Sequence, residues 1–330
     1  MKAVICRDFS PRANLRLEEV PSPVPGKGQV LMQVRACGLN FFDGLMVEGK
    51  YQTKPELPFT PGSEVAGVVT AVGENVVTLR PGQRVLAFNG IGGYAQEALA
   101  EAERVYPIPD AMSFEQAAGF LITYATSHHA LKDRAILRPG ETVLVLGAAG
   151  GVGLTAVEIA KRMGARVIAA ASTQEKLDLC RAHGADESIN YAEEDLRQRI
   201  KDLTQGRGVD VVYDPVGGGQ TETALRSLAV NGRHLVIGFA AGDIPKVALN
   251  LLLLKQTAIV GVFWGAFARA DPQRHAANMV ELFAWFAERS LRPHISARYP
   301  LDRFAEALDV VMERSAKGKV VLVMDEAEDA

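Results

Sequence analysis

The segment VLVLGAAGGVG at residues 143–153 decides the fold of this chain. The apolar run over 142–147 predicts a buried strand, and it leads directly into a turn rich in glycine. Residues 154–164 predict a helix that ends at Gly164, because glycine takes the left-handed conformation without a Cβ clash. A second strand is predicted over 166–171. This order of strand, glycine turn, helix and strand is typical of dinucleotide-binding proteins.

The glycines of the turn suit a bound pyrophosphate. The turn is tight, the backbone must come close to the phosphates, and the helix must pack closely on the strand. In the GxGxxG frame that ends at Gly153, Ala148 takes the first position and Gly150 the second, while Gly147 lies one residue earlier. We expect the phosphates at the helix N-terminus, where free N–H groups and the helix dipole favour anions.

The end of the second strand indicates which dinucleotide binds. An NAD enzyme usually carries Asp or Glu about 20 residues past the glycines, where it bonds the ribose 2′-hydroxyl. Here Ser172 and Thr173 end the strand, and Lys176 follows. A small hydroxyl and a cation suit a 2′-phosphate, so the sequence favours NADPH. Glu175 is the dissenting residue, and we interpret it as an exposed position in the first turn of the next helix.

Outside this unit the pattern of the chain changes twice. The first 120 residues hold short apolar or alternating runs separated by Pro/Gly turns, which predict a small barrel-like β domain. Ser113 and Gln116 then form a capping-box pattern that opens a helix. Strands and amphipathic helices alternate up to about residue 266, which predicts a doubly wound parallel sheet. The fold class expected is α/β.

Composition excludes several classes of protein. The 330 residues hold 36 Lys plus Arg and 39 Asp plus Glu, and a net charge of −3 gives no basic excess for nucleic acid. Three scattered cysteines, without a CxxC pair, fit a reducing cytosol, so a cytoplasmic protein is expected. The N-terminal residues show no signal peptide, and no apolar stretch predicts a membrane span. No GxSxG, HExxH or GxxxxGK[ST] motif occurs.

The sequence resembles the medium-chain dehydrogenase/reductases, and among them the zinc-free NADPH:quinone oxidoreductases. The resemblance spans nearly the whole chain and rests on GLNFFD (38–43), PFTPGSEVAGVV (58–69), PGQRV (81–85), GGYAQE (92–97), PGETVLVLGAAGGVG (139–153), GADESINY (184–191), GVDVVYDPVGG (208–218) and GRHLVIGF (232–239). It implies a GroES-like substrate domain over 1–121, completed by 267–330, and a Rossmann NADPH-binding domain over 122–266.

The resemblance also bears on zinc. Zinc-binding relatives carry Cys in the segment equivalent to 35–43 and His before the Glu of the segment equivalent to PGSE. Here Asn40 and Ser63 stand at those places, and Glu64 is retained. Without soft or imidazole ligands there, no zinc site is expected. The substrate should then be an electrophile that accepts hydride without a metal, such as a quinone or an activated double bond.

The resemblance implies a set of cofactor residues. Asn40 and Thr126 match positions near the nicotinamide, and Phe239 and Phe263 fall where backbone groups meet its amide. The pyrophosphate loop is matched by Ala149, Gly150, Gly151 and Val152. The pocket of the 2′-phosphate is matched by Ser172, Lys176, Tyr191 and Arg314.

Other residues are open to two interpretations. Asp43 and Glu64 are either structural ion-pair partners or functional groups. Tyr51 faces the substrate or packs, and with Asn40 it is the candidate for the substrate cleft expected between the domains. The proton donor stays open.

The expected activity is direct hydride transfer from NADPH to a quinone. One alternative acceptor is the activated double bond of an enone, an enoyl thioester or a 2-haloacrylate. An alternative of another class is a nucleotide-binding protein with a regulatory or structural role and little catalysis. The apolar run AIVGVFWG (258–265) predicts a strand at the sheet edge, which favours a homodimer.

Overall fold

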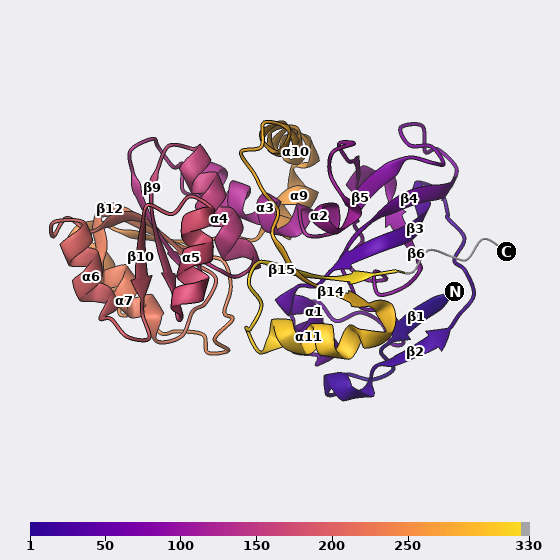
Figure 1. The fold of residues 1–330 in the computed structure, drawn as a ribbon, viewed down its shortest axis with the longest axis horizontal. Coiled ribbons are helices and arrows are strands. Elements are labelled where there is room, and N and C mark those ends of the chain that lie inside the picture. Colours follow the sequence, from indigo (N-terminus) through magenta and orange to yellow (C-terminus); the bar gives the residue numbers. More distant parts are fainter. Residues whose placement is uncertain (325–330) are drawn as a thin grey trace. The chain divides into compact units, whose positions relative to one another are not determined.

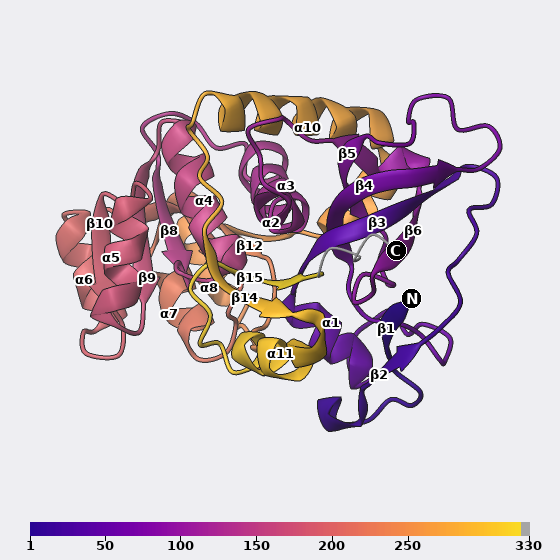
Figure 2. The same ribbon diagram turned by 45° about the vertical axis from the view of Figure 1, so that its right-hand side comes forward.

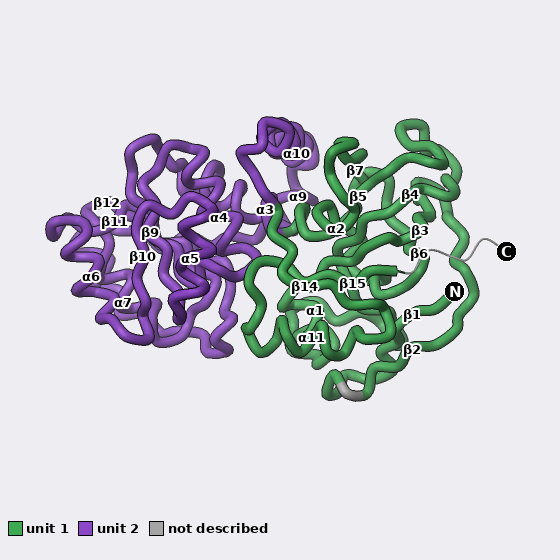
Figure 3. Tube along the Cα trace, in the orientation of Figure 1, with its two compact units in different colours: residues 1–122, 293–330 green, residues 123–292 purple. Residues whose placement is uncertain are grey.

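The computed structural model describes residues 1–324, which form two compact units, coloured separately in Figure 3. The first comprises Met1–Ile122 and the C-terminal segment from Pro293, and the second comprises Thr123–Arg292. This division differs from the expectation that the first domain resumes at residue 267. The helix over 272–287 stays with the second unit because its Glu281 bonds to His128 of the same unit, at 2.9 Å.

The second unit is built on a six-stranded sheet in the order β10-β9-β8-β11-β12-β13. Figure 1 labels β9, β10 and β12 of this sheet. Each adjacent pair of strands is parallel. The strands are β8 Thr142–Leu146, β9 Arg166–Ala171, β10 Glu187–Asn190, β11 Val209–Asp214, β12 Leu228–Val236 and β13 Ala258–Gly261. The helices are α3 Leu121–His128, α4 Gly151–Arg162, α5 Gln174–Ala182, α6 Leu196–Leu203, α7 Gln220–Arg226, α8 Asn250–Lys255, α9 Trp264–Ala270 and α10 Pro272–Ala287.

The strand order reverses at β8, since the chain runs outward from β8 to β10 and then returns to β11. Right-handed crossovers therefore place α4 and α5 on one face of the sheet and α6, α7 and α8 on the other. On that second face α6, α7 and α8 supply Ile200, Leu225 and Leu252 to a core with strand residues such as Leu144 and Ile168. The predicted doubly wound sheet is confirmed.

The helix stops inside this unit follow the sequence. Gly164 and Gly184 follow α4 and α5 with φ of +82° and +106°, a conformation that favours glycine. The predicted capping box also forms, since the backbone N–H of Gln116 donates to Ser113 Oγ at 3.2 Å and opens α2, Phe114–Ala118. The helical region that begins there is divided into α2, α3 and a π-helical turn over His129–Arg134.

The first unit is β-rich. Its seven-stranded sheet runs β14-β15-β3-β4-β5-β7, with β6 also paired to β3, and β1 and β2 form a separate pair. The strands are β1 Lys2–Ile5, β2 Arg16–Glu19, β3 Gln29–Gly38, β4 Glu64–Val72, β5 Arg84–Phe88, β6 Glu97–Glu101, β7 Val105–Pro107, β14 Ile295–Pro300 and β15 Lys319–Val323. Besides α2 the helices are α1 Phe41–Val47 and α11 Phe304–Met312.

Two features of this unit position residues far apart in the chain. The long strand β3 pairs with β4 on one side, and on the other side with β6 along its first half and β15 along its second. Helices α1 and α11 lie side by side in Figures 1 and 2. A Cβ at Gly44 of α1 would lie 2.4 Å from the sulfur of Met312, so a larger residue there would displace the Met312 side chain. Among residues 1–324, no helix has both the length and the apolar composition of a bilayer span.

Candidate functional site

The glycine turn lies where the sequence places it, between β8 and α4. Gly147 has a φ of +55°, and the N–H of Gly150 donates to its carbonyl at 3.0 Å, which closes the turn. A Cβ at Gly153 would lie 2.3 Å from the oxygen of Gly147, so only glycine lets α4 pack this closely on the turn. A Cβ at Gly150 would meet nothing nearer than 3.4 Å, so the space beside that backbone is open.

The N-terminus of α4 fits an anionic group. The helix begins at Gly151, and the N–H of Leu154 is the first to bond back, to the carbonyl of Gly150. The N–H groups of Gly151, Val152 and Gly153 therefore have no acceptor in a preceding helical turn. These free donors, the helix dipole and the open space beside Gly150 together fit a pyrophosphate.

The carboxyl ends of β9 and β10 bring the predicted 2′-phosphate residues of this unit together. Ser172 follows β9 directly, and Thr173 caps α5 by accepting the N–H of Lys176 at 3.3 Å. Tyr191 follows β10, and its N–H donates to the carbonyl of Ala171 at 3.1 Å. A strand pairing thus places Tyr191 beside Ser172, 19 positions away in the sequence. No carboxylate ends β9, and Glu175 is exposed in the first turn of α5, as expected.

The remaining predicted residues of the second unit flank the other half of the sheet edge. Phe239 follows β12, and Phe263 follows β13 with 57% of its surface exposed. Thr126 lies on α3, and the next residue, Ser127, bonds α3 to α4. The Ser127 hydroxyl lies 2.8 Å from the hydroxyl of Thr155 and 2.8 Å from that of Tyr213.

In the first unit Asn40 joins a buried polar cluster. Asn40 is 7% exposed and caps α1, and its N–H donates to Asp43 Oδ2 at 2.8 Å. The other oxygen of Asp43 accepts the Ser63 hydroxyl at 2.6 Å. Burial raises the pKa of Asp43 to about 6, although the hydrogen bonds from Ser63 and Asn40 oppose this. Asp43 and Ser63 are therefore direct partners inside the unit.

The cluster also contains Lys319, which sequence reasoning missed. Its Nζ donates to Asn40 Oδ1 and Leu39 O, each at 2.9 Å, and to Glu64 Oε2 at 3.2 Å. Burial raises the pKa of Glu64, although the Lys319 ammonium opposes the rise. Register explains the contact, because Glu64 on β4 and Val321 on β15 both pair with Gly38. No local signal in the sequence could reveal a pairing between segments 255 positions apart.

Two further predicted residues belong to the first unit. Tyr51 stacks on Phe42 with ring centroids 5.3 Å apart, which agrees with the packing interpretation of this tyrosine. Arg314 is exposed and follows α11 with a φ of +60°. The contacts that Asn40 and Arg314 are expected to make with a cofactor, and those of Asn40 and Tyr51 with a substrate, stay predictions.

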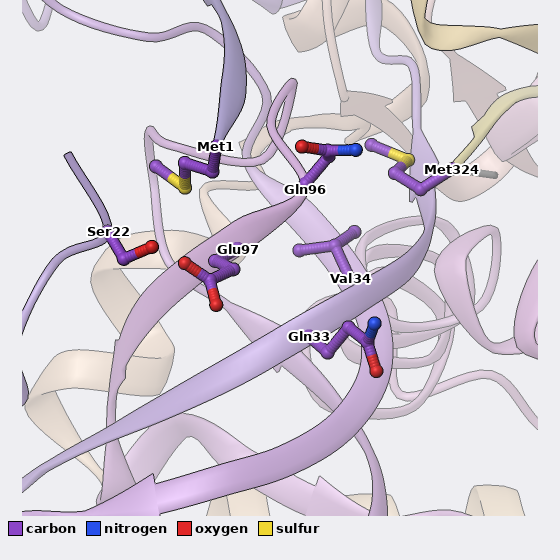
Figure 4. Close-up of a pocket in the computed structure, with 7 residues that line it drawn as sticks. All are labelled: Met1, Ser22, Gln33, Val34, Gln96, Glu97 and Met324. Carbon is purple, nitrogen blue, oxygen red and sulfur yellow. The ribbon is translucent and has the colours of Figure 1, made fainter. Parts of the chain in front are cut away.

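Neither a metal-ligand cluster nor the pocket drawn in Figure 4 suggests another centre. Within residues 1–324, no three His, Cys, Asp or Glu side chains gather as a ligand set. The absence of zinc stays a prediction. The pocket in Figure 4 has a volume of about 150 Å³ and belongs wholly to the first unit. Its lining residues are Met1, Ser22, Gln33, Val34, Gln96, Glu97 and Met324, none of which is a predicted site residue.

Comparison with known proteins identifies the family. A family model described as an alcohol dehydrogenase GroES-like domain matches residues 26–110, and one described as a zinc-binding dehydrogenase matches 151–285. Human quinone oxidoreductase is 36% identical over 327 residues, which cover 98% of this chain and 98% of the relative. The chain belongs to the zinc-free quinone oxidoreductases of the medium-chain dehydrogenase/reductase superfamily.

Other members of this quinone oxidoreductase family agree in sequence and fold. A quinone oxidoreductase-like protein 2 homolog of Nematostella vectensis is 42% identical over 300 residues, 90% of this chain and 82% of the relative. The crystal structure of Escherichia coli quinone oxidoreductase complexed with NADPH superposes with a TM-score of 0.91 at 29% identity, covering 98% of this chain and all of that one. The predicted family and its Rossmann and GroES-like architecture are thereby confirmed, and the chain is an oxidoreductase.

Proposed function

We propose that this protein transfers hydride from NADPH to a quinone. The observation that supports NADPH as the cofactor lies at the edge of the parallel sheet. Free N–H groups are found at the N-terminus of α4, and Ser172 stands where an NAD site has a carboxylate. NADPH is bound in the solved E. coli relative, and the residues of this edge fit it. The relatives named quinone oxidoreductase support a quinone as the hydride acceptor.

Each part of the site has a separate role in this proposal. NADPH supplies the hydride. The N–H groups of Gly151 and Val152 bind the pyrophosphate, and Ser172 with Lys176 and Tyr191 recognises the 2′-phosphate. Thr126, Phe239 and Phe263 orient the nicotinamide end. The protein contributes binding and orientation, because a positioned donor and acceptor need little further catalysis for hydride transfer.

Titration of NADPH and NADH tests the cofactor. Binding is followed by the change in protein fluorescence. We expect NADPH to bind with at least tenfold higher affinity than NADH, because only NADPH carries the phosphate that Ser172 and Lys176 would bind. Ser172→Asp should narrow or reverse that ratio by placing a carboxylate against the phosphate. Equal affinity of the unaltered protein for both nucleotides would contradict this assignment.

A panel of acceptors tests the substrate. Steady-state NADPH oxidation is measured with 1,4-benzoquinone and 1,4-naphthoquinone, and in parallel with an enone, an enoyl thioester and 2-haloacrylate. We expect the quinones to be reduced with the higher kcat/KM. Turnover of the alkenes alone would reject the quinone in favour of the other acceptor class, and tight NADPH binding without turnover of any acceptor would favour a regulatory protein.

The proposal includes catalysis without zinc. Asn40 and Ser63 take part in the hydrogen bonds to Lys319 and Asp43 that the structure shows, and neither side chain is a good zinc ligand. We expect the rate of NADPH oxidation to be unchanged after dialysis against a chelator. Elemental analysis should find far less than one zinc per chain, on the order of 0.1 or below, because no stoichiometric metal is bound.

We also propose a homodimer that works in the cytoplasm. Strand β13 lies at the end of the sheet, and among residues 1–324 only β12 pairs with it. Its Ile259 is 38% exposed, and on the neighbouring helix α8 Leu253 is 79% exposed. An unpaired edge next to exposed apolar side chains favours pairing with a second copy about a two-fold axis. The substrate domain is proposed to end at residue 121 and to resume near the C-terminus.

A further inference from the structure

The turn after β11 is organised by one buried carboxylate that the proposed function has not used. Asp214 is the last residue of β11 and is 2% exposed. Its Oδ1 accepts the N–H groups of Val216 and Gly217, both at 2.9 Å. Its Oδ2 accepts the Thr221 hydroxyl at 2.9 Å and His234 Nε2 at 3.0 Å. Four donors therefore converge on one side chain.

The charge of Asp214 is stabilised inside the sheet. Burial by itself disfavours the ionised form, but His234 and the donors of the turn outweigh burial and lower the pKa of the Asp214 carboxyl. His234 lies on β12, whose residues pair in register with β11, so it is delivered by the sheet. Its Nδ1 has no hydrogen-bond partner among the described residues, so Nε2 is the ring nitrogen that donates to Asp214.

The turn that Asp214 holds touches both neighbouring parts of the sheet edge. Gly217 and Gly218 have φ of +68° and +63°, a strained path that needs glycine and local hydrogen bonds. On one side a Cβ at Gly147 would lie 2.8 Å from the side chain of Val216, so Val216 packs directly on the glycine turn. On the other side the N–H of Ala241 donates to Val216 O at 2.8 Å, which ties the turn to the segment after Phe239.

The place of this turn decides which half of the cofactor it meets. The 2′-phosphate residues follow β9 and β10, and the pyrophosphate turn follows β8. Strand β11 lies on the opposite side of β8, where the strand order reverses. A dinucleotide crosses such a sheet at this switch point. The half beyond the pyrophosphate, which carries the nicotinamide, must therefore extend over the ends of β11 and β12.

We propose that Asp214 is a positioning residue for the nicotinamide half of NADPH. Through its four hydrogen bonds, it fixes the 215–218 turn against Gly147 and beside Phe239, and so forms the surface on which that half rests. The inference rests on the proposed NADPH site, and it assigns Asp214, Thr221 and His234 a role that the sequence did not suggest.

The test compares two ligands that share only the adenosine half. Adenosine 2′,5′-bisphosphate carries the 2′-phosphate but no nicotinamide, so its affinity should not depend on the 215–218 turn. Isothermal titration of Asp214→Ala should show NADPH affinity at least tenfold lower and adenosine 2′,5′-bisphosphate affinity within twofold of the unaltered protein. Asp214→Asn should recover most of the loss, because an amide oxygen still accepts the N–H groups of Val216 and Gly217.

A matched control separates this role from general destabilisation. Glu158 is a buried carboxylate of the same unit that accepts the hydroxyl of Tyr124 and a ring nitrogen of His183. Glu158→Gln should lower stability without changing either affinity. If Asp214→Ala does not fold, Thr221→Val removes one donor at constant shape and should weaken NADPH about threefold, with adenosine 2′,5′-bisphosphate unchanged.

Two results would overturn the inference while leaving the proposed function intact. One is an unchanged NADPH affinity in Asp214→Ala, or in Thr221→Val where that variant carries the test. The other is an equal loss of both ligands, which would assign Asp214 to the stability of the whole unit. Failure of the unaltered protein to bind either ligand would instead overturn the proposed function.

Discussion

At the scale of single residues, the buried carboxyl of Asp43 should make the stability of the folded protein depend on pH. It is fully buried beside Ser63 and the N-terminus of α1, and burial raises its pKa from 3.8 to about 6. The folded protein therefore holds the Asp43 proton more tightly than the unfolded chain does. This favourable contribution is complete below pH 4 and is lost as pH rises through 6.

Asp43→Asn should remove this dependence, because an amide does not titrate and Ser63 can turn its hydroxyl to Gly90 O, 2.9 Å away. Two pKa units correspond to about 3 kcal/mol. Because pH 4.5 already lies above the unfolded pKa of 3.8, the unfolding free energy of the unaltered protein relative to the variant should fall by about 2 kcal/mol of this total between pH 4.5 and 7.5. Urea titrations at both ends of this range measure it, and a difference that stays constant or grows with pH would show that burial does not raise this pKa.

At the scale of an element, two glycines at the N-terminus of α4, Gly150 and Gly153, should respond differently to substitution by alanine. One substitution should affect mainly NADPH binding, and the other should also affect stability. A Cβ at Gly150 would make only an ordinary van der Waals contact, 3.4 Å from Gly147 O, and φ there is −76°, so alanine fits the folded protein. The added methyl group would instead occupy the space expected for the pyrophosphate. Gly150→Ala should therefore weaken NADPH at least tenfold and change the unfolding free energy by no more than about 1 kcal/mol.

Gly153→Ala provides the contrast on the same helix. Its Cβ would lie 2.3 Å from the carbonyl oxygen of Gly147, so α4 must move away from the turn. We expect a loss of about 1–3 kcal/mol in unfolding free energy together with the loss of NADPH binding. Thermal unfolding and NADPH titration of both variants measure these effects. An equal loss of unfolding free energy in Gly150→Ala and Gly153→Ala would contradict the expected difference between the two glycines.

At the scale of the whole molecule, the free edge of β13 should determine the oligomeric state. Ile259→Lys places a charge on that edge, and buried pairing with a second copy would then leave the charge without water. We expect sedimentation equilibrium to show a dimer for the unaltered protein and a monomer for this variant at micromolar concentration. Val77→Lys is the control, since Val77 is exposed in a loop of the other unit. A dimer that survives Ile259→Lys would move the interface elsewhere.

Much of the second unit could be predicted because its signals are local. The apolar run over 142–147, the glycine turn and Gly164 lie within about 20 residues, and each acts on its immediate neighbours. The structure shows β8, α4 and β9 in that order with the predicted stop. The unit to which 272–287 belongs was harder to predict, because an amphipathic helix does not indicate which surface covers its apolar face.

The sequence by itself determined the dinucleotide fold, the family and the preference of the β9 edge for a 2′-phosphate, since these depend on residue types at short spacing. Tertiary structure alone decided that Lys319 meets Glu64 and Asn40, and that His234 meets Asp214. These contacts arise when strands pair in register, and a register joins positions that are far apart along the chain. A buried charge needs partners from several such segments, so its role becomes visible only once the sheet is formed.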